Sequence, residues 1–225
     1  MQVMERELNN IRIKAASMSV TSGEMYQQAI RALLNHDVDL ARQVVARDRL
    51  VDVYELEIDE MCLNFLALYA PKAVELRYIV AVLRLIMELE RVADHSKAVS
   101  RQVIDCHCAA LMPLLPDFET ILNLTLQMLR EATDTFFEKN EEKYESIIET
   151  DKKVGRLQRD LNASLAQLIR DDAGNIDGAI VLLNIVRRVE RIGDHSKTIA
   201  ELVPYIASGR VVRHKEAVID ANPDN

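Results

Sequence analysis

Residues that interrupt helices are scarce in this sequence. It contains 6 glycines and 5 prolines in 225 residues, no tryptophan, and only 4% aromatic residues. So few glycines and prolines leave long stretches free to form helices, and so few aromatic residues are atypical of a sheet-rich core. No segment shows the two-residue alternation of a convincing strand. We therefore expect an all-α protein.

Two further absences concern membranes and nucleic acids. No apolar run reaches the roughly 18 residues of a membrane-spanning helix, and the N-terminus lacks the basic and apolar regions of a signal peptide. We therefore expect a cytoplasmic protein that meets the membrane only through its partners. The formal net charge is −8. Because phosphate neutralisation needs a basic stripe and none is evident, we expect no nucleic-acid partner.

Motifs for catalysis and for structural zinc are missing as well. The sequence has no Gly-x-Ser-x-Gly motif and no glycine-rich phosphate loop, so we predict no enzymatic activity, no catalytic residues and no organic cofactor. Cys106, His107 and Cys108 are adjacent, but a zinc site normally has two pairs of ligands. We interpret these three residues as the end of a helix in a reducing compartment.

An acidic octapeptide occurs twice in the chain. Residues 90–97 read ERVADHSK and residues 190–197 read ERIGDHSK, 100 positions later. The correspondence extends upstream, where Asp48 matches Asp151 at an offset of 103. The difference of three residues falls in a connection near Pro71, where loops tolerate insertions. The chain is therefore a tandem duplication, and we expect two copies of one site.

Apolar residues in each half recur at steps of three and four, which is typical of amphipathic helices. The expected helices cover residues 5–35, 38–70, 73–109, 117–139, 141–171 and 176–208. Three helices in each half predict two tandem three-helix bundles related by the duplication. We place the first bundle at residues 1–112 and the second at residues 113–225, with the boundary at the proline-rich segment 113–116.

Each octapeptide places two carboxylates in the direction of an apolar stripe. At about 100° per residue, Glu90 and Asp94 lie within about 20° of the direction in which Leu83 points. Glu190 and Asp194 repeat this arrangement. Carboxylates removed from water need a cation or hydrogen-bond donors. We expect each pair to face an acid on a neighbouring helix, Asp48 in the first half and Asp151 in the second.

Two explanations satisfy this pattern. Basic side chains such as Arg91 and Lys97, or arginines of neighbouring helices, would neutralise the acids in a salt-bridge network. Alternatively, the oxygen ligands would bind a metal such as Mg²⁺, Mn²⁺ or Fe. The metal prediction names six ligands: Glu90, Asp94, Glu190, Asp194, Asp48 and Asp151. Lys97 and Lys197 point within about 60° of the neighbouring Asp, so they compete with a cation.

His95 and His195 point about 100° away from the Asp that precedes them. They are therefore weaker ligand candidates than the carboxylates, and we expect them to pack or to support the ligands.

The repeated Glu-Arg-Ile/Val-Gly/Ala-Asp-His pattern resembles the acidic motifs of the PhoU family of phosphate-uptake regulators. The resemblance extends over nearly the whole chain. It implies a cytoplasmic, non-catalytic adaptor that represses the phosphate-starvation response between a phosphate ABC transporter ATPase and a membrane sensor histidine kinase. It also implies metal ions, Mg, Mn, Fe or Zn, on Glu90, Asp94, Glu190 and Asp194. We further expect a homodimer.

Two other functions remain alternatives. A di-iron carboxylate oxidase or metal-storage protein is also a helical bundle with inward carboxylates. Its Glu-x-x-His motif has a spacing of three, whereas Glu90 and His95 are five residues apart, which disfavours it. An accessory regulator of a different phosphate or anion carrier would fit the same sequence.

Overall fold

The structure is a computed structural model that describes residues 2–105, 110–140 and 143–209. Within these ranges it is all-helical, as predicted, and contains no strand. The long helices are α1 (Gln2–Asn35), α2 (Val38–Tyr69), α3 (Val74–Asp105), α4 (Phe118–Glu138), α5 (Tyr144–Asp171) and α6 (Ile176–Ser208), with short 3₁₀ helices η1 (Met112–Leu114) and η3 (Ala173–Asn175).

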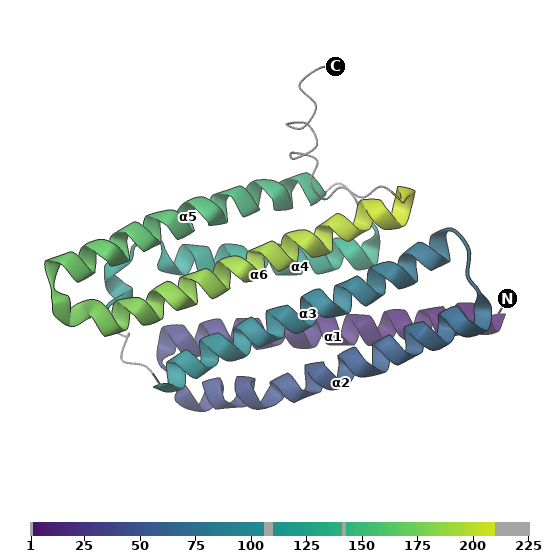
Figure 1. The fold of residues 1–225 in the computed structure, drawn as a ribbon, viewed down its shortest axis with the longest axis horizontal. Coiled ribbons are helices and arrows are strands. Elements are labelled where there is room, and N and C mark those ends of the chain that lie inside the picture. The colour runs from purple at the N-terminus through teal and green to yellow at the C-terminus, as the bar shows by residue number, and fades with distance from the viewer. Residues whose placement is uncertain (1, 106–109, 141–142, 210–225) are drawn as a thin grey trace, which may run out of the picture.

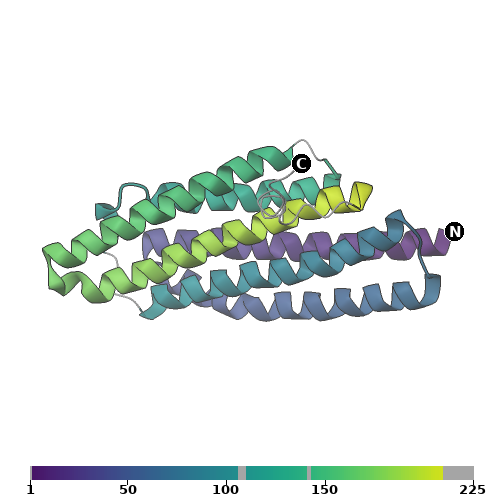
Figure 2. The ribbon, with the colours of Figure 1, turned by 45° about the horizontal axis from the view of Figure 1, so that its top comes forward.

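The six long helices form two three-helix bundles that lie side by side (Figure 1). Helices α1, α2 and α3 pack on one another, and α4, α5 and α6 form the second set. The third helices of the two sets, α3 and α6, run antiparallel along the junction, and α1 also contacts α4 (Figures 1 and 2). The two octapeptides are therefore on adjacent helices.

Side-chain and backbone hydrogen bonds cap several of the helix ends. Asp37 caps α2 by accepting a hydrogen bond from the Leu40 amide at 2.9 Å. That helix ends at Ala70, which adopts a left-handed conformation and donates its amide to the Leu66 carbonyl. In the second half, Asp172 accepts from the Gly174 amide at 2.8 Å and forms the tight connection into α6. The connection near Pro71 was expected to be three residues longer, but both connections contain four residues between their α-helices, 70–73 and 172–175.

Most predicted bounds are within one residue of those observed, and two differ. The first helix begins at Gln2 rather than at residue 5. The third helix is described as far as Asp105, and the rest of its expected range, residues 106–109 with Cys106, His107 and Cys108, lies outside the described residues. The fifth helix begins at Tyr144, three residues later than expected. No described helix is both long and apolar enough to cross a bilayer.

The apolar residues with helical spacing form one continuous core. Val51, Ile58, Cys62 and Phe65 of α2 are buried, as are Leu161 and Leu165 at the corresponding face of α5. On α3, however, the buried stripe passes through Leu85 and Leu89, whereas Leu83, from which the direction of the acids was taken, is only partly buried. The acids of the octapeptide therefore lie at the margin of the core rather than at its centre.

Candidate functional site

The predicted acids of the first repeat lie where α2 packs on α3. Asp48 is on α2 and is only 6% exposed, while Glu90 and Asp94 are half-buried one turn apart on α3. Lys97, also on α3, bridges the two helices. Its Nζ donates to Oδ2 of Asp48 at 2.5 Å and to Oδ1 of Asp94 at 3.4 Å. The structure thus brings Asp48 and Asp94 together around an ammonium group.

The hydrogen bond to Asp48 raises the pKa of Lys97 above its usual value, so the lysine stays positively charged at neutral pH. A buried carboxylate needs such a partner, because desolvation of an unpaired charge is costly. Lys97 therefore acts as the internal cation of the first cluster. This arrangement is the salt-bridge network that the sequence allowed.

The second repeat uses its lysine in a related way. Lys197 donates to Oδ2 of Asp151 at 3.0 Å, joining α6 to α5. Asp194 is paired instead with Nη1 of Arg191 at 3.1 Å. Burial lowers the pKa of Lys197, but the hydrogen bond and charge of Asp151 outweigh it and the net shift is upward. The two copies share their residues but differ in how the charges are paired.

The glutamates of the octapeptides are incompletely neutralised. Burial raises the pKa of Glu90 to about 7, and the charge of Asp94 adds to this shift, while Arg91 opposes it. The pKa of Glu190 is also raised, first by burial and then by Asp194. Cationic partners in these clusters therefore do not fully offset the cost of desolvating the glutamates.

Sequence reasoning missed two acids of the first cluster. Asp52 and Glu55 follow Asp48 at one and two turns on α2, so helical spacing could have identified them. The pKa of Glu55 is raised by burial and then by the charge of Asp52. The corresponding positions of the second repeat hold Gly155 and Gln158. The first cluster is therefore the more acidic of the two.

As placed, these side chains do not fit a bound metal ion. Among the described residues, no three His, Cys, Asp or Glu side chains converge closely enough to hold one. The ammonium groups of Lys97 and Lys197 take positions beside the carboxylates that a cation would need. The assignment of metal ligands therefore stays a prediction.

The two histidines of the octapeptides meet between the repeats. The rings of His95 and His195 stack with centroids 5.4 Å apart. Nδ1 of His195 lies 2.7 Å from Oε2 of Glu88. Burial lowers the pKa of His95 to about 4, and the positive charges of His195 and Arg188 contribute to the shift. His95 is therefore neutral at physiological pH, and both histidines pack at the α3–α6 contact.

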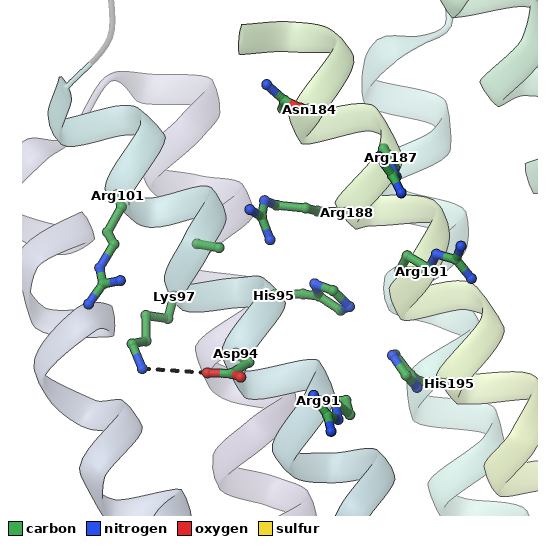
Figure 3. A pocket seen from close by; sticks show the side chains of 11 residues that line it. Arg91, Asp94, His95, Lys97, Arg101, Asn184, Arg187, Arg188, Arg191 and His195 are labelled. Carbon is green, nitrogen blue, oxygen red and sulfur yellow. Dashed lines mark hydrogen bonds and ion pairs between the residues drawn. The ribbon is translucent and has the colours of Figure 1, made fainter.

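A cavity of about 660 Å³ opens between α3 and α6 beside His95. Arg188 extends from α6 toward α3 in this cavity, and His95 extends from α3 toward α6 (Figure 3). Its lining is dominated by basic side chains, namely Arg91, Lys97, Arg101, Arg187, Arg188 and Arg191. Sequence reasoning did not single out this group. Position-by-position comparison of the repeats would have shown that arginines replace other residues there.

Fold and site together define a tandemly duplicated six-helix protein with one lysine-bridged acid cluster in each repeat and a basic cavity between them. The sequence profile of the PhoU domain matches both repeats, over residues 15–103 and 118–203. The chain belongs to the PhoU family.

Similar proteins cover almost the whole chain. The phosphate-specific transport system accessory protein PhoU of Serratia marcescens is 32% identical over 92% of this chain and 86% of that protein. The protein of the same name from Escherichia coli (strain K12) is 31% identical over the same shares. The crystal structure of PhoU from Pseudomonas aeruginosa is 29% identical and gives a TM-score of 0.85, covering 92% of this chain and 99% of that one.

Proposed function

We propose that this chain is an accessory regulator of phosphate uptake that works by binding other proteins. The observation that carries the proposal is similarity to phosphate-specific transport system accessory proteins at 31–32% identity across both repeats. Such extensive similarity includes both acid clusters and their connecting helices rather than one isolated motif. The function is therefore assigned to the duplicated unit as a whole.

Within this function, the proposed partners are the ATPase of a phosphate ABC transporter and a membrane sensor histidine kinase. The chain acts in the cytoplasm and represses the phosphate-starvation response. It catalyses no reaction, and its six long helices offer extended faces for partner proteins. A partner changes the signalling state only if the adaptor binds its two states with different affinity. Partner binding is thus the step on which regulation depends.

Deletion of the gene tests this proposal. We expect higher expression of phosphate-starvation genes in phosphate-replete medium, with repression restored by the wild-type chain on a plasmid. Purified protein should bind the phosphate transporter ATPase and the kinase, with the ATPase of an unrelated ABC transporter as the control. If expression and polyphosphate content are unchanged and neither partner is bound, the adaptor function is wrong. Regulation of a different anion carrier would then be tested.

A further inference from the structure

The cavity between α3 and α6 contains positive charges that the protein itself does not neutralise. Arg91 and Arg191 have ion-pair partners, Glu90 and Asp194, and Lys97 is held by Asp48 and Asp94. Arg101, Arg187 and Arg188 form no ion pair or hydrogen bond in the part of the chain that the structure describes. Three guanidinium groups are therefore available in one cavity.

These three arginines occur where the two repeats differ. At an offset of 100, Arg187 corresponds to Met87, Arg188 to Glu88, and Arg101 to Glu201. The glutamate, arginine, aspartate, histidine, serine and lysine of the octapeptide, by contrast, are the same in both repeats. Divergence has therefore placed three additional cations on one side of the stacked histidines and two carboxylates on the other.

The contacts on the two sides of the stacked histidines differ accordingly. On one side, Glu88 is bonded to His195 at 2.7 Å. On the other, Arg188 takes the place of that glutamate beside His95, and its Nε is buried without a hydrogen-bond partner. A buried donor without a partner costs free energy that an incoming acceptor would recover. Among the described residues that line the cavity, Asp94 is the only one with a carboxylate, and it already accepts from Lys97.

We infer that this cavity binds a soluble anion that carries two or more phosphate groups. Guanidinium groups match phosphate oxygens in bidentate geometry, and charge-assisted hydrogen bonds of this kind are strong. The unpaired arginines come from both helices, so one phosphate group would meet Arg187 and Arg188 and another would meet Arg101. A volume of about 660 Å³ holds such an anion. The positive charge of this cavity also contrasts with the net charge of −8 of the whole chain.

This inference goes beyond the proposed regulatory function and does not depend on it, because binding is measured with the purified protein alone. Isothermal titration with inorganic tripolyphosphate, in metal-free buffer at about 50 mM salt, should show saturable binding. Orthophosphate and sulfate should bind more weakly, because each reaches only part of the cavity. Binding should weaken at higher salt, since charged contacts near the surface are screened.

The repeats provide matched variants. Arg187→Met with Arg188→Glu installs the residues of the first repeat, which that repeat already accommodates at equivalent helix positions. We expect tripolyphosphate binding to weaken at least tenfold, with the circular dichroism spectrum unchanged. The control is Arg84→Asn, which replaces an arginine of α3 by the asparagine found at the equivalent position of α6. This position lies on the other side of the stacked histidines. It should bind as tightly as the wild type.

If the double variant does not fold, Arg188→Gln serves in its place, because it removes the guanidinium charge but keeps a polar side chain that can donate hydrogen bonds. Unchanged affinity in the folded double variant, or in Arg188→Gln, would overturn the assignment. So would the absence of any wild-type binding at millimolar tripolyphosphate. An equal loss of affinity in Arg84→Asn would show a nonspecific charge effect and would also overturn it.

Discussion

His95 and His195, which occupy the same position in the two repeats, stack on each other where α3 crosses α6. The pair marks the centre of the internal symmetry, yet its two members have different neighbours. His195 is bonded to Glu88, whereas His95 lies beside Arg188 and is held neutral. The contact between the repeats therefore combines residues that are the same in both repeats with neighbours that differ.

The low pKa of His95 predicts a pH dependence of stability. Its pKa falls from 6.5 to about 4 on folding. Between these values the unfolded chain binds more protons than the folded one, so this group destabilises the protein as pH falls through that range. Thermal unfolding of wild type and His95→Gln between pH 7 and 4.5 measures the effect. The variant should lose less stability on acidification.

The raised pKa of Glu90 contributes a slope of the opposite sign, because the folded state then binds more protons. The contribution of Glu90 is present in both the wild type and His95→Gln, so the difference between their stability curves reports on His95. Parallel curves for the two proteins would contradict the assigned pKa shift.

Removal of the internal cation of the first cluster should destabilise the protein. In Lys97→Met, Asp48 remains buried without its partner, and we expect a loss of about 3 kcal/mol in the free energy of unfolding. This loss is near the lower end of the range for breaking a buried ion pair, because the Lys97 side chain is 23% exposed. Urea unfolding provides the measurement. Adding Asp48→Asn to the variant should recover much of the loss, and no recovery would show that Lys97 acts through packing instead.

The same variant tests the metal prediction. Mn²⁺ should raise the melting temperature of Lys97→Met more than that of the wild type, because a ligand that binds only the folded state stabilises it. Elemental analysis of wild-type protein purified without chelator is the companion measurement. Stoichiometric metal in the wild type would mean that the lysine moves aside on binding. No response of either protein to Mn²⁺ would leave the carboxylates with a structural role only.

A buried hydrogen bond between α1 and α4 should couple the repeats. The hydroxyl groups of Tyr26 and Thr125 are 2.6 Å apart, and Thr125 also lies within donating distance of the Ile121 carbonyl. Thr125→Val leaves the Tyr26 hydroxyl buried without a partner and should cost about 1–3 kcal/mol. Combining it with Tyr26→Phe should cost less than the sum of the two single changes. Additive losses in urea unfolding would rule out coupling.

One substitution should stabilise the protein. Gly193 is buried within α6, and the first repeat has Ala93 at this position. A Cβ at Gly193 would meet Thr125 at 3.6 Å and Val154 at 3.7 Å, which are ordinary contacts. Because alanine favours the helix over glycine, Gly193→Ala should add about 0.5–1 kcal/mol. A lower melting temperature would instead reveal tight packing of α6 against its neighbours.

Much of the architecture was predictable from local patterns. Helical spacing identified the six long helices. Repetition of the octapeptide predicted that Asp48 would face the acids of α3, which the contact through Lys97 bears out. These features depend on residues close in sequence, or on pairs of helices in one repeat. The position of the buried stripe on α3 was less predictable, because packing of α6 covers residues that one bundle alone would expose.

The sequence by itself determined the helical class, the duplication and the repeated acids of the two clusters, because helix periodicity and repetition are local properties of the chain. Only the tertiary structure decided how those charges are paired and that Arg101, Arg187 and Arg188 gather beside the stacked histidines. Arg101 is 86 residues or more from the other two along the chain. Their proximity follows from the antiparallel packing of α3 on α6, which depends on burial across the repeats rather than on the pattern within either one.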